Sequence, residues 1–508
     1  MRAQATAGER RWRLYLTLVF ALLVAACASP RPHKVTMGAD DIDCKVGSSL
    51  IPNNAQCFDR TPEVSTVPPY RLHFVEFDDQ GWLYPGRDDN GYVPDMGTAH
   101  DQLENAIRDV ASRLQNERVL LLVYVHGWKH TAAHDDRDVK RFRQMLSDAA
   151  VFDARHLNRT VVGIYVGWRG ASQLSASNPL INLTFWTRKN AAMHVSEGAP
   201  RELFARIRAL REHFNVVDPR EPGPKLRTVV IGHSFGGWVV FSALSPSILE
   251  LLAQRADVGG SAKDWQQGRL RSVADMVILV NPAFEATRYE PIHSLVQNLA
   301  QKQKLKEYEP PVLLIVTSKA DDATRMAFPS GRFLNTLFQR PFVSDDEAYA
   351  AIRTPGFVER YVTHNLSRDG ADAPRGEGID PPKCQGWRAA PADPGTENEK
   401  ARLSRMQNNG ILEKQRHVEW QRDLKGNNNK LQAKWTRQYC GGTSIVHENY
   451  SPHSPVWNVV TDGSVINDHN DIMGEPLHAF FRQLYLELPD PGLADTQARP
   501  KSIDSTDP

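Results

Sequence analysis

Five continuous apolar segments constrain the fold of this chain more than any other feature of its sequence. They are rich in valine, leucine and isoleucine and comprise 119–125, 161–166, 228–231, 276–280 and 312–316. A strand that is apolar at every position is buried on both faces, which is typical of parallel strands covered by helices on both sides. We therefore predict an α/β fold with a mostly parallel central sheet.

The segments between and around these strands favour the same architecture. Tyr70–Phe77 alternates as a strand does, and 81–84 could return beside it as a hairpin partner. A helix that packs on the sheet is indicated by helical spacing of the apolar residues Leu103, Ile107, Val110 and Leu114. A final strand is expected at Val456–Val460, followed by a helix near 476–486 whose packing stripe is Leu477, Phe480, Phe481 and Leu484.

The pentapeptide Gly232-His233-Ser234-Phe235-Gly236 lies between the third apolar segment and a stretch that can form a helix. A serine on a tight turn from strand to helix has a strained backbone, so the residues two before and two after it must be small. Gly232 and Gly236 meet that demand. The turn would expose the hydroxyl of Ser234 and direct the amide of Phe235 toward a developing oxyanion. We predict a nucleophilic serine; the alternative is a glycine-rich connection with an inert one.

A serine hydroxyl needs a histidine to take its proton and a carboxylate to orient that histidine. His469 is the candidate base, because it lies on a polar loop directly after the predicted final strand. His447 and His453 precede that strand, and His478 belongs to the predicted last helix. The alternative for His469 is an ordinary surface histidine.

The carboxylate is expected just beyond the end of a strand. The 276–280 segment leads to Asn281, which is an amide, whereas the 312–316 segment leads to Asp321 and Asp322. We favour Asp321 and keep Asp322 as the alternative. Either residue could instead cap the segment that follows.

His126-Gly127-Trp128 follows the first apolar segment and resembles the loop of α/β hydrolases whose amide after the glycine is the second oxyanion donor. That donor would be the amide of Trp128. The four-residue spacing of His126, His130 and His134, with aspartates beside them, also fits a metal site. We favour a role for His126 in shaping the loop, and we predict neither a metal nor another cofactor.

Residues 1–26 are expected to be a lipoprotein signal peptide, with a basic start and an apolar core at Leu14–Val24. Val24-Ala25-Ala26-Cys27 resembles the bacterial lipobox, which implies cleavage before Cys27 and lipidation of its thiol. The small residue Ala28, in place of an aspartate directly after the cysteine, resembles the pattern of lipoproteins that are sent to the outer membrane of Gram-negative bacteria. The alternatives are a twin-arginine signal around Arg10-Arg11 and an uncleaved membrane anchor.

The other cysteines are Cys44, Cys57, Cys384 and Cys440, an even number that suits disulfides in an oxidising compartment. Of three connectivities we favour the local one, Cys44 with Cys57 and Cys384 with Cys440. The formal net charge of this chain of 508 residues is +1, with acidic and basic residues evenly mixed, so we predict no nucleic-acid partner.

The expected domain organisation is one catalytic domain with additions. Residues 27–69 would be a tether, 70–321 the core, and 322–455 a cap-like insertion with a disulfide. Residues 456–490 would complete the core, and 491–508 would be a disordered tail. A further segment, 170–188, is either a lid or acyl-pocket wall or an ordinary packed loop.

Four sequence blocks carry a resemblance to the α/β-hydrolase superfamily, and within it to bacterial esterase- or lipase-like lipoproteins: 167–170, 184–188, 324–329 and 468–472. The resemblance covers about Tyr70 to Leu486. It implies an α/β-hydrolase fold and a serine hydrolase of the esterase type, and it names no substrate. With the lipobox, we expect a lipid-anchored enzyme that acts on small-molecule or lipid esters. An acyltransferase with the same triad and a non-catalytic envelope scaffold are the rival hypotheses.

Overall fold

The computed structural model describes residues 45–46, 63–66, 68–84, 87–88, 91–92, 101–156, 158–170, 185–215, 223–257, 268–269, 272–329, 344–368, 382–391, 397–447, 451–472 and 474–488. The predicted signal peptide, its Cys27 and the predicted tail lie outside these residues, as do Cys44, Cys57 and the 171–184 part of the possible lid.

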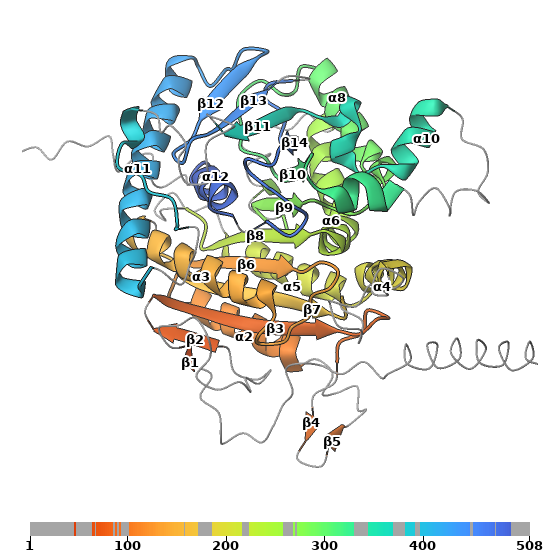
Figure 1. Cartoon of the computed structure of the whole chain (residues 1–508), viewed down its shortest axis with the longest axis vertical. Coiled ribbons are helices and arrows are strands. Elements are labelled where there is room, and N and C mark those ends of the chain that lie inside the picture. The colour runs from red at the N-terminus through yellow and green to blue at the C-terminus, as the bar shows by residue number, and fades with distance from the viewer. Residues whose placement is uncertain are drawn as a thin grey trace, which may run out of the picture.

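A twelve-stranded sheet forms the centre of the protein, in the order β1-β2-β3-β7-β6-β8-β9-β10-β14-β11-β13-β12 (Figure 1). Its middle strands are β3 (Pro69–Phe77), β7 (Thr160–Trp168), β6 (Val119–Val125), β8 (Leu226–His233), β9 (Met276–Val280), β10 (Leu313–Ser318) and β14 (Val456–Thr461). Each of these seven pairs in parallel with the next. The predicted α/β class and mostly parallel sheet are therefore confirmed.

Helices cover both faces of the sheet because the strands are apolar on both faces. In β6, Leu121 and Val123 pack on one side, while Leu120 and Leu122 pack on the other. The first side is covered by α2 (Asp101–Leu114), α4 (Phe185–Glu197), α5 (Pro200–Phe214), α6 (Phe235–Asp257) and α8 (Glu290–Gln301). The second side is covered by α3 (Arg137–His156) and α12 (Glu475–Tyr485). The predicted helices at 101–114 and 475–485 are thus present.

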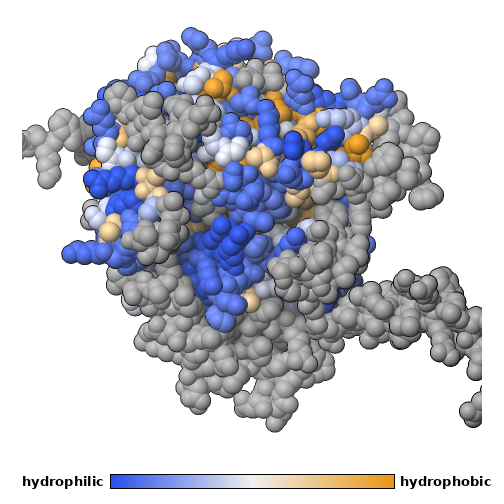
Figure 2. All heavy atoms as spheres, viewed as in Figure 1, coloured by the Kyte–Doolittle hydropathy of each residue, from blue (hydrophilic) through white to orange (hydrophobic). Residues whose placement is uncertain are grey.

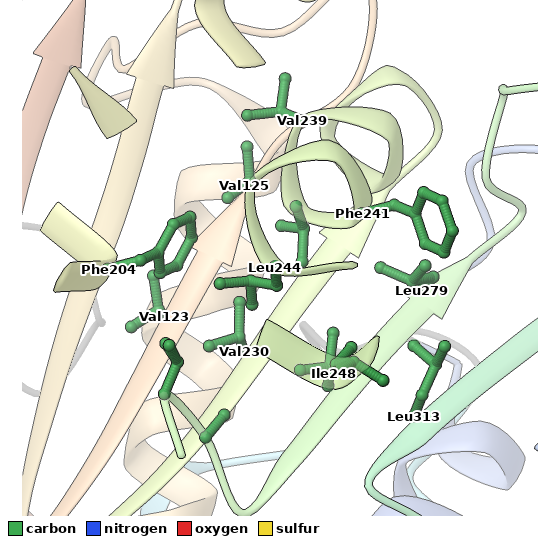
Figure 3. Packing of buried hydrophobic residues seen from close by; sticks show 14 of the residues in the cluster. Val123, Val125, Phe204, Val230, Val239, Phe241, Leu244, Ile248, Leu279 and Leu313 are labelled. Carbon is green, nitrogen blue, oxygen red and sulfur yellow. The ribbon is translucent and has the colours of Figure 1, made fainter. Parts of the chain in front are cut away.

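Figure 3 shows the packing on the first side, where side chains of α6 lie over the strands. Val239, Phe241, Leu244 and Ile248 face Val230, Leu279 and Leu313, and all of them are buried. Among the described residues, Phe235–Ala256 is the one helical segment long and apolar enough to cross a membrane, yet 61% of its most apolar window is buried. A core helix passes the same test, so its composition reflects its place in the interior. On the face of the molecule that Figure 2 shows, the coloured residues are mostly hydrophilic.

The expectation of a tether over 27–69 is wrong for the residues of it that the structure describes. β2 (Glu63–Thr66) pairs in antiparallel fashion with β3, and β1 (Lys45–Val46) pairs with β2. Both oxygens of the buried Glu63 carboxylate accept hydrogen bonds from Arg143 of α3, at 2.7 and 2.8 Å. This ion pair spans 80 residues of sequence, which is why the polar local composition did not indicate a strand.

The segment 322–455, expected to be a cap-like insertion, contributes three strands to the sheet. β11 (His364–Arg368), β13 (Thr443–His447) and β12 (Trp435–Gln438) extend the sheet beyond β14, which is therefore not an edge strand. β11 is parallel to β14, and the two outer pairs are antiparallel. The long helix α11 (Glu399–Gly426) packs against α3, as seen on the left of Figure 1. The strands of this segment widen the sheet by pairing beyond β14, and charged residues of α11 pair with residues of the core.

The remaining elements are short. They are α10 (Asp345–Ile352), the π-helical turn η3 (Ala323–Ala327), the two-stranded ribbon β4 (Arg87–Asp88) and β5 (Gly91–Tyr92), and the 3₁₀ turns η2 (Ala286–Arg288), η4 (Pro355–Phe357), η5 (Glu359–Tyr361) and η6 (Pro382–Cys384). The predicted pairing of Cys384 with Cys440 is present, with Cα atoms 5.6 Å apart. It joins η6 to the residues that follow β12.

Candidate active site

Ser234 occupies the turn between the end of β8 and the start of α6. Its φ angle is 55°, in the left-handed region that a non-glycine residue rarely adopts. A Cβ atom added at Gly236 would collide with the carbonyl oxygens of Val125 and His126, so only glycine lets α6 approach β6 this closely. The amide of Ser234 donates to the carbonyl of Val280 at 3.1 Å. The strained conformation is therefore fixed from both neighbouring strands.

His469 and Asp321 complete a hydrogen-bonded chain with this serine. The hydroxyl of Ser234 donates to Nε2 of His469 at 2.8 Å, and Nδ1–H of His469 donates to Oδ2 of Asp321 at 2.8 Å. The three side chains come from loops after β8, β10 and β14, whose carboxyl ends lie at one edge of the parallel sheet. In Figure 1 the arrowheads of β6 and β8 point to that edge. The structure thus brings the three predicted residues together.

Asp321, and not Asp322, is the carboxylate that meets His469. Asp321 is fully buried and also accepts hydrogen bonds from the amides of Ala323 (2.9 Å) and Thr324 (3.2 Å) and from the Thr324 hydroxyl (2.6 Å). Burial alone would raise the pKa of Asp321, but the charge and hydrogen bond of His469 and the bonds from Thr324 lower it. The side chain of Asp322 is 74% exposed and pairs with Arg325 at 2.7 Å.

The two predicted oxyanion donors lie beside the serine. Phe235 is the first residue of α6, so its amide belongs to the positive end of the helix dipole. Trp128 follows Gly127, and a Cβ added at Gly127 would lie 2.8 Å from the Cβ of Ser234. The residue before Trp128 therefore lies against Ser234.

His126 shapes this loop, as predicted. Its Nδ1–H donates to the carbonyl of Gly127 at 2.9 Å, and its Nε2 accepts from the amide of Trp168 at 3.1 Å. The indole of Trp168 also stacks on the imidazole and donates to the His126 carbonyl at 2.8 Å. Burial lowers the pKa of His126 to about 4, so the ring stays neutral and keeps this tautomer.

The structure does not group His126 and His134 with His130 among the described clusters of possible metal ligands. His130 instead meets Asp136 and Asp138, with one possible ligand atom from each within 4.8 Å of the others. Those atoms already have partners: Nδ1 of His130 contacts Oδ1 of Asp136 at 2.9 Å, and Asp136 accepts from the amides of Thr131 and Asp138. The group builds the start of α3.

Sequence analysis missed two residues that hold the loop of His469. The Nε2–H of His233 donates to the His469 carbonyl at 2.8 Å, and the Asn281 amide reaches the same oxygen at 3.4 Å. Asn281 also accepts from the amide of Ser318 at 2.9 Å. Their positions in the sequence could have identified them, because His233 ends β8, Asn281 follows β9 and Ser318 ends β10. Polar residues at the carboxyl ends of adjacent strands converge on one edge.

An apolar cavity of about 80 Å³ lies elsewhere, between the sheet and helices α3 and α12. Its walls include Leu122, Ile231, Phe152 and Phe481, and none of Ser234, Asp321 and His469 lines it. It is therefore a packing feature of the second face and not the pocket of the candidate active site.

Comparison of the chain with protein-family models, with curated proteins and with solved structures found no match. The class of the molecule is accordingly defined by its architecture: a mixed α/β protein with a mostly parallel sheet flanked by helices, carrying a hydrogen-bonded Asp-His-Ser chain at the carboxyl edge of that sheet.

Proposed function

We propose that this protein is a serine hydrolase of the α/β-hydrolase fold that cleaves carboxylic esters through an acyl-enzyme. One observation carries the proposal: Asp321, His469 and Ser234 form a continuous hydrogen-bonded chain that ends on a serine held at positive φ between a strand and a helix. This is the arrangement that converts a weak hydroxyl into a nucleophile. The order Ser, Asp, His along the chain supports the α/β-hydrolase assignment.

In the proposed mechanism, Ser234 Oγ attacks the ester carbonyl while His469 Nε2 takes the hydroxyl proton. Asp321 holds the ring and stabilises the imidazolium, and its lowered pKa keeps it ionised. The amides of Phe235 and Trp128 would bind the oxyanion of the tetrahedral intermediate. His469 then returns the proton to the departing alcohol. Water, deprotonated by the same histidine, attacks the acyl-enzyme, and the carboxylic acid leaves as Ser234 regains its proton.

The proposal of an ester substrate draws on the sequence blocks at 167–170, 184–188, 324–329 and 468–472, which resemble those of esterase- and lipase-like proteins. We propose small-molecule or lipid esters, and no cofactor enters the mechanism. An acyltransferase would share every step up to the acyl-enzyme and would differ only in using an alcohol in place of water.

We also propose that the protein is anchored in the cell envelope through lipidated Cys27, with the outer membrane as its destination. The proposal rests on the sequence Val24–Cys27, and the Cys384–Cys440 disulfide supports an oxidising compartment. Intact-mass spectrometry of the membrane fraction tests it. The expected mature chain begins at acylated Cys27 and is absent in Cys27→Ser, and an unmodified chain beginning elsewhere would overturn it.

Hydrolysis of esters of graded acyl length, with and without added alcohols, tests the activity. The wild type should release acid and incorporate a fluorophosphonate probe at Ser234, located by peptide mass spectrometry. Ser294→Ala, at an exposed serine of α8, should do the same. Transfer of the acyl group mainly to the alcohol would instead identify an acyltransferase. A folded wild type that neither labels nor hydrolyses any ester would refute the proposal.

A further inference from the structure

The main chain of His469 is held by the residue that immediately precedes the proposed nucleophile. His233 Nε2–H donates to the His469 carbonyl at 2.8 Å, and the two imidazole rings lie 4.9 Å apart at an angle of 44°. Asn281 adds a longer bond of 3.4 Å to the same oxygen. The loop also has hydrogen bonds of its own, and Arg141 donates to the Asn470 carbonyl at 2.7 Å. The bonds from His233 and Asn281 are the ones described that reach the main chain of His469 itself.

The tautomer of His233 follows from its partners. Because Nε2 donates to a carbonyl, Nε2 carries the proton and Nδ1 carries a lone pair. Nδ1 is buried and has no hydrogen-bond partner among the described residues, and it lies 3.0 Å from where a Cβ of Gly127 would be. A second proton, on Nδ1, would therefore find no acceptor among the described residues. Burial, and then the neighbouring His469, lower the pKa of His233 far below its usual value.

His233 also has a fixed relation to the other parts of the site. It is the last residue of β8 and the neighbour of Ser234, and it touches the loop that leads to Trp128. A rotation of its ring would release the His469 carbonyl and disturb the position of Gly127. The neutral imidazole of His233 is therefore adjacent to the nucleophile, to the base and to the oxyanion loop, and it contributes no charge to the reaction.

We propose that His233 is a positioning residue, which sets the distance between His469 and Ser234 by holding the His469 carbonyl through Nε2–H. The inference rests on the proposed serine hydrolase function. It assigns His233 no contact with the substrate and no proton transfer.

The matched pair His233→Gln and His233→Met tests it, because the two side chains have the same length and only glutamine can donate a hydrogen bond. His233→Met should lower kcat by about 10- to 100-fold, since misplacement of a catalytic group by about 1 Å costs on that order. KM should stay within about threefold, because the ester does not touch this residue. His233→Gln should recover most of the lost kcat.

Equal kcat in the two variants, or wild-type kcat in a folded His233→Met, would overturn the inference. A second measurement needs no variant: ¹⁵N-histidine NMR of the wild-type protein should show His233 as the Nε2–H tautomer, without titration between pH 5 and 9. An Nδ1–H tautomer or a titrating His233 would also overturn it. Failure of the proposed function would look different, since the wild type itself would then neither hydrolyse esters nor take up the probe.

Discussion

Two regions of the sheet are stabilised in contrasting ways. The catalytic edge consists of Ser234, Asp321 and His469 with the strand ends beneath them, and the extension consists of β11, β12, β13 and α11. At the catalytic edge Ser234 and Asn281 adopt positive φ angles, and such conformations cost roughly 1 to 3 kcal/mol each. The amides of Ser234 and Asn281 donate to carbonyls of the neighbouring strands, and these backbone hydrogen bonds hold the strained conformations in place. Function and strain therefore coincide at this edge.

The strands of the extension join the core through pairing of β11 with β14 and through apolar packing, whereas α11 is joined to the core by buried ion pairs. Arg402 of α11 is buried against Asp148 of α3, and Arg482 of α12 donates to Glu413 of α11 at 2.9 and 3.2 Å. The indole of Trp387 also donates to Glu413 at 3.0 Å. Removing one member of such a buried pair costs about 3 to 5 kcal/mol because the other is left unpaired. The comparison teaches that activity and stability should respond to different substitutions in this molecule.

Ser234→Ala is the strongest test of that separation. We expect ester turnover to fall by about a millionfold, since nucleophile and base act as one unit. The thermal midpoint should remain close to that of the wild type, because the backbone conformation and core packing are retained. Turnover with a fluorogenic ester and calorimetry measure the two effects. Wild-type turnover in the variant would show that Ser234 is not the nucleophile and that this edge of the sheet is not the active site.

Asp321→Asn should reduce turnover by about ten-thousandfold, as expected when an amide holds the histidine in the wrong tautomer. Asp322→Asn is the matched control at the adjacent, exposed position, where an ion pair with Arg325 contributes little. Steady-state kinetics of both variants give the answer. Equal losses would mean that the pair acts jointly, and a loss in Asp322→Asn alone would move the triad by one residue.

Loss of the disulfide should affect the extension and spare the catalytic edge. The bridge closes a loop of 56 residues, so the Cys384→Ser/Cys440→Ser variant should lose about 4 kcal/mol of unfolding free energy in the chain-entropy model. Turnover per folded molecule should not change. Urea unfolding measures the loss, and dithiothreitol should shift the wild type but not the variant. A variant that is fully folded yet inactive would show that the two regions are coupled.

The smallest expected effect is a pH dependence of stability. His417 of α11 is buried, which together with the charges of Arg437 and Lys414 lowers its pKa to about 3. Between about pH 6.5 and 3 the unfolded chain therefore binds a proton that the folded protein does not. Its stability should fall as the pH is lowered through that range, by up to about 1.4 kcal/mol per pH unit from this group.

His417→Gln removes that contribution, so unfolding free energies at pH 5 and 6 should differ less in the variant than in the wild type. Urea titrations at both pH values provide the measurement, and turnover at pH 8 should be unaltered. An identical pH slope in the two proteins would show that His417 is protonated in the folded state.

Much of the core was predictable because its signals are local. An apolar run records that both faces of a strand are buried, and the glycines around Ser234 record a turn that tolerates no larger residue. The position of His469 after the last parallel strand was readable for the same reason, since carboxyl ends of parallel strands share an edge. The pairing of Cys384 with Cys440 followed from their separation from the other cysteines.

The sequence by itself determined the class of fold, the strand-turn-helix around Ser234 and the approximate places of an acid and a base. Only the tertiary structure decided that Asp321 rather than Asp322 meets His469, that His233 holds the His469 carbonyl, and that the polar segment with α11 widens the sheet. Glu63 meets Arg143 across 80 residues, and Arg402 meets Asp148 across 254. A charged residue shows the same local pattern whether it is solvated or paired, so its partner exists only once the chain has folded.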